Sequence, residues 1–280
     1  MKITVLMGGT SSERNVSLAS GIRIVKALRD RGHKVTALDP ARGVLSAKEE
    51  QELSNGKVGT EPPSLESLSK VAEGAFLPNL TSMKEVKEAD VAFLALHGGQ
   101  GEDGTIQALL DMARVKYTGS GHLASALAMD KDLSKKLFRA EEVKTADWLM
   151  APAAVEQVEG MLGLPVVVKP SKQGSTVGLT LVKKREDLAP AIDEAFKYDD
   201  EVMIERFVPG RELTVGVLGD LALPVGEIIS KHEIYDYECK YTAGMAREEF
   251  PAKLSPEATE GCSTRPWRHS GRSSSGATRA

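Results

Sequence analysis

The chain has 280 residues, of which 41% are hydrophobic and 27% charged, and its formal net charge is −4 at pH 7. This length supports a sizeable core in one large domain or in two to three smaller ones, and the composition is that of an ordinary globular protein. The acidic balance argues against nucleic acid and membrane surfaces as partners, and no apolar run approaches the roughly 18 residues that a membrane helix needs.

Strand-like and helix-like segments alternate over the first 120 residues. An apolar strand at residues 3–7 leads through a Gly- and Ser-rich loop into a helix that should end at Gly32, and a second strand follows at 34–38. A further strand at 90–96 leads through another Gly-rich loop into a helix at 105–113. Such units imply a parallel sheet with ligands at the carboxyl ends of its strands. The first apolar run is too short for a secretory signal, so we expect a cytoplasmic protein.

A second, α+β unit follows a flexible break at residues 119–121. A helix is predicted to run without interruption through Met129 to Phe138, and the apolar strand at 164–168 delivers Lys169 to a loop of glycine, serine and threonine. A strand end that holds a cation beside backbone N–H groups and hydroxyls suits a polyphosphate, although a solvent-exposed hairpin turn would look similar. The remaining predicted elements are a strand at 179–183, a helix at 187–196 and strands at 202–208, 212–218 and 223–230.

The last twenty residues differ sharply from the rest. All 40 acidic residues precede Gly261, and residues 261–280 contain four arginines, five serines and almost no apolar side chain. Pro266 and the glycines of this stretch, Gly261 included, oppose a helix. We expect a disordered, aberrant tail of the kind that a shifted reading frame leaves; a basic functional arm is the alternative.

Several loops together resemble the D-alanine–D-alanine ligases of the ATP-grasp superfamily, over residue 1 to about 260. The motifs that carry the resemblance are GGTSSER at 8–14 with VSL at 16–18, ALHG at 95–98 with GEDG at 101–104, YTGSG at 117–121, AMDK at 128–131, the loop at 169–178, IERF at 204–207 with Glu212, and YDYECKY at 235–241.

That resemblance implies an α/β fold with a defined domain order. An N-terminal parallel α/β substrate domain at 1–120 is followed by an ATP-grasp α+β nucleotide-binding domain at 121–260. Its small lobe spans about 121–203, its large lobe, about 204–260, is truncated, and the tail occupies 261–280. The implied activity is ATP-dependent ligation of two D-alanines to D-alanyl-D-alanine through an acyl phosphate, for peptidoglycan precursors. The family also implies ATP and D-alanine as partners and a homodimer.

The resemblance assigns roles to residues that would bind the nucleotide. Lys131 and Lys169 would grip the phosphates of ATP, and Lys240 would reach the transferred phosphate, because phosphoryl transfer needs positive charge around the phosphates. The loop with Gly174 and Ser175 would close over them and exclude water. Two carboxylates complete this set, namely Glu205 for the adenine and Glu212 for the ribose.

The substrate residues implied by the resemblance are Glu13 for the ammonium of the first D-alanine and His97 for the carboxylate or acyl phosphate. Ser175 and Tyr241 would hydrogen-bond towards Glu13 and close the site. We expect all of these residues to converge on one cleft. Plainer interpretations stay open for each residue type. The lysines could be solvated surface cations, and Glu205 and Glu212 could be solvated carboxylates at strand edges. His97 could be a hydrogen-bonded histidine in a turn, and Glu13 a carboxylate that the N-terminus of a helix favours.

The family's Mg²⁺ ligands and oxyanion arginine lie on Arg-x-Asp and Glu-x-Asn motifs that this sequence lacks. Two cysteines, Cys239 and Cys262, provide neither a disulfide framework nor a spaced ligand set. We therefore predict no metal ligands in this chain, although the family implies Mg²⁺ alongside ATP, and we expect impaired catalysis. Alternatives are a non-catalytic nucleotide- or D-alanine-binding remnant and another ATP-grasp carboxylate–amine ligase.

Overall fold

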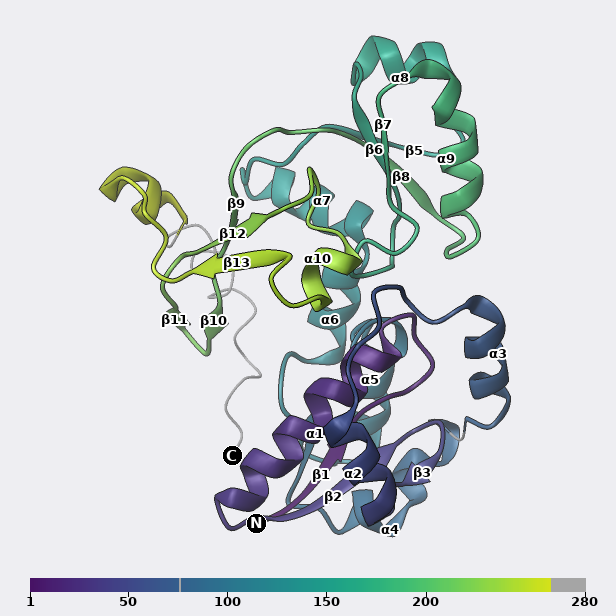
Figure 1. Cartoon of the computed structure of the whole chain (residues 1–280), viewed down its shortest axis with the longest axis vertical. Coiled ribbons are helices and arrows are strands. Elements are labelled where there is room, and N and C mark those ends of the chain that lie inside the picture. The colour runs from purple at the N-terminus through teal and green to yellow at the C-terminus, as the bar shows by residue number, and fades with distance from the viewer. Residues whose placement is uncertain (76, 263–280) are drawn as a thin grey trace. The chain divides into compact units, whose positions relative to one another are not determined.

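The computed structural model describes residues 1–75 and 77–262 (Figure 1). The chain divides into two compact units, Met1–Met129 and the part from Asp130 onward. Within the described residues, no helix is both long and apolar enough to cross a membrane. The expectation of a disordered tail falls on residues 263–280, which lie outside the described part.

The first unit is built around a four-stranded sheet in the order β3-β2-β1-β4. Strand β1 pairs in parallel with both β2 and β4, and β3 is antiparallel to β2. This confirms the prediction that the strands near residues 3–7 and 90–96 share one parallel sheet. The elements of this unit are β1 Lys2–Leu6, α1 Arg14–Asp30, β2 Lys34–Asp39, β3 Gly43–Val44, α2 Ala47–Asn55, α3 Leu65–Glu73, a 3₁₀ helix at Leu77–Ser82, α4 Lys84–Lys87, β4 Val91–Leu94, a 3₁₀ turn at Gly99–Gly101, α5 Thr105–Met112 and α6 His122–Met129.

Both faces of this sheet are buried, which explains why β1 reads as a continuous apolar run. Alternation along the strand sends Ile3 and Val5 to one face, where they share a cluster with Val25 of α1. Leu6 faces the other side, in a cluster with Ile106 of α5. Helices on both sides thus fix the carboxyl ends of β1 and β4, from which two Gly-rich loops leave.

The second unit contains an antiparallel sheet in the order β5-β8-β6-β7, a three-stranded sheet in the order β13-β12-β9, and the pair β10-β11. Its elements are α7 Lys131–Ala140, β5 Trp148–Met150, α8 Val155–Met161, β6 Val166–Pro170, β7 Thr180–Val182, a 3₁₀ turn at Arg185–Asp187, α9 Leu188–Ala195, β8 Val202–Arg206, β9 Glu212–Thr214, β10 Val217–Leu218, β11 Leu221–Ala222, β12 Gly226–Ser230, α10 Tyr237–Tyr241, β13 Ala246–Glu249 and a helical segment at 256–262.

Three sequence predictions about local structure are wrong. The helix predicted to continue through Met129 breaks at Asp130, whose side chain accepts from the backbone N–H of Leu133 at 3.0 Å and caps α7. The apolar spacing continues across this break and therefore conceals it. The predicted strand at 212–218 is two short strands, β9 and β10, in separate sheets. Gly261 lies within a helical segment rather than opposing one.

The sheet β5-β8-β6-β7 has one apolar and one polar face. Val166 and Val168 of β6 and Ile204 of β8 belong to a buried cluster with residues of α8 and α9, which Figure 1 shows beside this sheet. Because side chains alternate along a strand, Lys169 of β6 and Glu205 of β8 must face the opposite side. The antiparallel register places Val167 opposite Glu205, so Lys169 lies one diagonal step from that carboxylate.

Candidate functional site

Two loops are joined at the carboxyl ends of β1 and β4 in the first unit. Ser11 donates its hydroxyl to the carbonyl of His97 at 2.5 Å, and the His97 ring Nε2 lies 3.0 Å from the hydroxyl of Ser20 on α1. The hydroxyl of Ser17 donates to the carbonyl of Ala95 at 2.7 Å and accepts from the N–H of Gly8 at 2.8 Å. A pocket lined by residues of both loops, His97 among them, lies here. This is the edge of a parallel sheet where ligands bind.

Glu13 lies at the N-terminus of α1 and is 5% exposed. Gly98, with a φ of +64°, passes so close that a Cβ there would lie 2.7 Å from Glu13 Oε2. A left-handed backbone and this approach both require glycine at position 98. The structure therefore brings Glu13 beside the backbone that follows His97, and the positive end of the helix dipole favours its carboxylate.

A buried ion pair supports the first of these loops. Arg14 is 7% exposed and donates from Nη2 to Asp39 Oδ2 at 2.5 Å and from Nη1 to the carbonyl of Gly9. Asp39, which is fully buried, also accepts from the N–H groups of Gly9 and Ala41 at 3.0 Å and 2.9 Å. Sequence analysis missed Asp39, although a carboxylate at the end of the strand after an Arg-bearing motif could have pointed to it. The pair is well satisfied and holds the backbone that precedes Glu13.

In the second unit, Glu205 joins two lysines on the polar face of the sheet. Lys169 Nζ lies 2.5 Å from Glu205 Oε2, and the Nζ of Lys135 on α7 bonds the other carboxylate oxygen. Burial alone would raise the pKa of Glu205, but the charges and hydrogen bonds of Lys169 and Lys135 outweigh it, and that pKa lies below its usual value. Lys169 and Glu205, which the sequence predicted, and Lys135, which it did not, thus form one compact group of charges.

Lys135, like Asp39, was not among the residues predicted from the sequence. Its ammonium also donates to Thr145 Oγ1 at 2.6 Å and lies 5.0 Å from the centre of the Trp148 ring. Lys131 lies one helical turn earlier and donates to the carbonyl of Ser171 at 3.0 Å and to that of Gln173 at 2.5 Å. Residues four apart share a helix face, so the position of Lys131 could have pointed to Lys135.

The loop after β6 carries Gly174 and Ser175 in an irregular conformation. Ser175 and Thr176 have φ values of 48° and 61°, a left-handed geometry that costs these residues about 1–2 kcal/mol each. The Ser175 hydroxyl lies 2.7 Å from the hydroxyl of Tyr241 on α10, a hydrogen bond between segments 66 residues apart in sequence. Tyr241 also packs edge-on against Tyr237, with ring centres 4.6 Å apart. The bond therefore ties the loop to α10.

Glu212 and Lys240 are the remaining residues of the second unit that the sequence predicted for the site. Burial raises the pKa of Glu212, and the charge of Lys240 opposes this shift. The Lys240 ammonium lies 5.5 Å from the centre of the Tyr235 ring.

Each unit thus assembles part of the predicted site. The first brings Glu13 and the His97 loop together, and the second joins Lys169 with Glu205 and Ser175 with Tyr241. That all nine predicted residues share one cleft stays a prediction.

Comparison with known proteins identifies the family. Residues 2–120 match the family described as D-ala D-ala ligase N-terminus, and residues 131–268 match D-ala D-ala ligase C-terminus. The chain is 41% identical over 258 residues to D-alanine–D-alanine ligase of Geobacter sulfurreducens, covering 91% of this chain and 70% of that protein. The same enzyme of Rhodospirillum rubrum is 42% identical over 256 residues, covering 91% and 74%.

Solved structures agree. The VanG D-Ala:D-Ser ligase of Enterococcus faecalis superposes with a TM-score of 0.72 at 27% identity, covering 94% of this chain and 80% of that one. D-alanine–D-alanine ligase of Bacillus anthracis complexed with ATP gives 0.68 at 27% identity, covering 96% and 75%. An ATP-grasp ligase fold is thereby defined. The chain belongs to the D-alanine–D-alanine ligase family.

Proposed function

We propose that this protein joins two D-alanines to D-alanyl-D-alanine at the expense of ATP, for the synthesis of peptidoglycan precursors. The observation that carries the proposal is the hydrogen bond of 2.7 Å between Ser175 and Tyr241. It holds a strained, Gly-containing loop against a helix that also bears Lys240, which is what a lid over a reacting phosphate requires. The named relatives and the family support the same activity.

Positive charge on the second unit would bind and orient the nucleotide. ATP supplies the γ-phosphate that converts a carboxylate into an acyl phosphate. Lys131 and Lys169 would face its phosphates, and Lys240 the transferred one. In this structure Lys169 is neutralised by Glu205. Lys135 bonds the other oxygen of that carboxylate, so Glu205 keeps a cationic partner when Lys169 turns to phosphate.

On the first unit, Glu13 would hold the ammonium of the first D-alanine and His97 would lie near its carboxylate. Glu13 is nearly buried, and a buried carboxylate attracts a cation more strongly than an exposed one does. The amine of the second D-alanine attacks the activated carbonyl, forms the new C–N bond and expels phosphate, while the amine proton passes to a base or to solvent. Exclusion of water by the Gly174–Ser175 loop would protect the acyl phosphate from hydrolysis.

The one three-residue group of potential metal ligands among the described residues does not fit Mg²⁺, which the family implies. Within 1–75 and 77–262, one group of at least three potential ligands is close enough to share an ion, and it consists of His232, Asp236 and Cys239. Mg²⁺ prefers six oxygen ligands, so a histidine and a thiol are unsuited to it.

The test is release of phosphate by the purified chain in the joint presence of ATP, Mg²⁺ and D-alanine, with the dipeptide identified by mass spectrometry. Ser175→Ala and Tyr241→Phe each remove one partner of the same bond, so each should lower kcat about 3- to 10-fold and the double variant little further. Phosphate release that needs no D-alanine, or fully additive losses, would contradict the proposal.

A cytoplasmic location, expected from the sequence, and a homodimer, expected from the family, belong to the same proposal. Light scattering on the purified chain measures the second: a mass of about one chain, whose calculated mass is 30.0 kDa, would contradict the dimer.

A further inference from the structure

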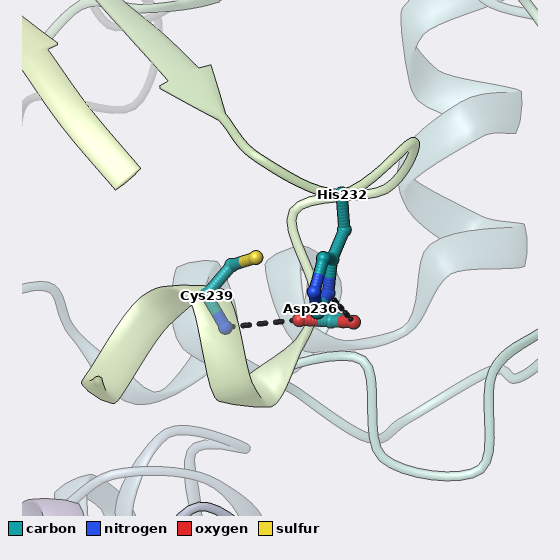
Figure 2. Close-up of side chains that lie close together, drawn as sticks. All are labelled: His232, Asp236 and Cys239. Atoms are coloured by element: carbon teal, nitrogen blue, oxygen red, sulfur yellow. Dashed lines mark hydrogen bonds and ion pairs between the residues drawn. The ribbon is translucent and has the colours of Figure 1, made fainter. Parts of the chain in front are cut away.

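A histidine, an aspartate and a cysteine converge in the segment that joins β12 to α10. Figure 2 shows His232 and Asp236 facing each other, with the Cys239 sulfur pointing towards the loop that bears His232. His232 Nδ1 lies 2.7 Å from Asp236 Oδ2, and Asp236 Oδ1 accepts from the N–H of Cys239 at 2.9 Å. One potential ligand atom from each residue lies within 4.8 Å of the others. All three belong to one short stretch of the second unit.

The three donors are those that zinc takes in proteins. Imidazole nitrogen, carboxylate oxygen and thiolate sulfur all bind Zn²⁺, and the two anions among them would neutralise its charge. Tetrahedral ligands at about 2.0–2.3 Å from zinc lie about 3.5 Å apart. Ligand atoms now separated by up to 4.8 Å must therefore approach each other by roughly 1 Å, while the His232–Asp236 pair at 2.7 Å must open slightly. Rotation of His232, whose side chain is 39% exposed, supplies that movement, because Cys239 is buried and fixed on the helix.

We propose that His232, Asp236 and Cys239 form a binding site for one zinc-like divalent cation, with solvent in the fourth position. The sequence predicted no metal ligands, because it lacks the family's Mg²⁺-binding motifs and its two cysteines provide no spaced ligand set. On binding, the Cys239 thiol loses its proton to solvent and the ring nitrogen that binds the metal gives up its own. The cation then replaces the hydrogen bond between His232 and Asp236.

Occupancy of this site would tie the loop to the first turn of α10. Asp236 is the N-cap of that helix, which ends at Tyr241, the partner of Ser175. Glu233, which lies between His232 and Asp236 in the sequence, pairs with Lys183 at 2.6 Å, just beyond β7. A metal at the site would therefore hold α10 relative to a loop that also contacts the residue after β7 through an exposed ion pair.

A hydrogen-bonded pair with a helix cap explains the same geometry without a metal, so the test must separate the two. The full chain is freed of metal with a chelator and titrated with Co²⁺ in a phosphine reductant. Thiolate-to-cobalt charge-transfer absorption and tetrahedral visible bands should saturate at one ion per chain, and Zn²⁺ should displace them.

Variants and matched controls decide which residues bind. Cys239→Ser and His232→Gln should weaken Co²⁺ binding by about 100-fold or more, and Asp236→Asn, which keeps the oxygen that caps α10, by about 10- to 100-fold. Cys262→Ser should change nothing, and neither should His122→Gln, which alters a similar histidine–aspartate pair (2.9 Å to Asp111). Circular dichroism checks that each variant is folded.

Charge-transfer absorption that survives in Cys239→Ser or disappears in Cys262→Ser would overturn the site, as would the absence of saturable binding in the unaltered chain. The titration uses neither ATP nor D-alanine. Its failure would leave the proposed ligase activity unaffected.

Discussion

Replacing Lys135 with methionine tests whether the cluster of Lys135, Lys169 and Glu205 contributes to nucleotide binding. The side chain of Lys135 is 7% exposed and that of Glu205 17%. Loss of one partner of a buried ion pair costs about 3–5 kcal/mol, because the remaining charge stays buried. Here Glu205 keeps Lys169 at 2.5 Å, so we expect about 2 kcal/mol. Methionine retains the apolar stem, which limits the loss to charge and hydrogen bonds.

Thermal unfolding measures this loss, and Lys136→Met is the matched control. For a chain of this size, about 2 kcal/mol lowers Tm by roughly 4–8 °C. Lys136 is the next residue on the same helix, but its side chain is 61% exposed and pairs with Asp132 one turn away. Exposed pairs of this kind contribute little, so its Tm should hardly change. In the assay, Lys135→Met should raise the KM for ATP more than that for D-alanine, and Lys135→Arg should restore it.

Equal losses of Tm in the two methionine variants would refute this reasoning. So would an unchanged KM for ATP in Lys135→Met, since Glu205 would then bind the nucleotide without its second lysine.

Two further predictions concern the backbone beside Glu13 and the pH dependence that Glu205 causes. Gly98→Ala should lower the free energy of unfolding by about 1–3 kcal/mol and raise the KM for D-alanine, because position 98 combines a positive φ with a clash against Glu13. Gly119 is the matched control: it also has a positive φ, but no atom lies within 4 Å of an added Cβ, so Gly119→Ala should affect stability alone. Stability should also fall in acid. The pKa of Glu205 is depressed from 4.5 in the folded state, so its contribution is present above pH 4.5 and disappears as the pH falls through the lower folded value. Urea unfolding between about pH 6 and pH 3.5 should show a shallower loss for Glu205→Gln, and identical profiles would contradict the assignment.

The sequence by itself determined the parallel sheet of the first unit and most of the residue types of the site. Apolar runs that alternate with Gly-rich loops and amphipathic helices bury their apolar faces as a parallel sheet covered by helices. In agreement with this, β1 pairs with β4 as predicted. Periodicity is a local property, so these elements could be predicted without knowing their neighbours. The same property misled where a regular apolar pattern crossed Asp130, because a cap depends on one side chain and its backbone geometry rather than on spacing.

Only the tertiary structure decided which charges meet. Alternation within a strand fixes the face of Lys169 and of Glu205, but the register between β6 and β8 brings them within 2.5 Å of each other. The face that α7 turns towards Glu205 then selects Lys135, and not the adjacent Lys136, as the second partner. Ser175 and Tyr241 likewise come together across 66 residues of chain. Such pairings depend on how separate elements dock, and no pattern within one element contains that information.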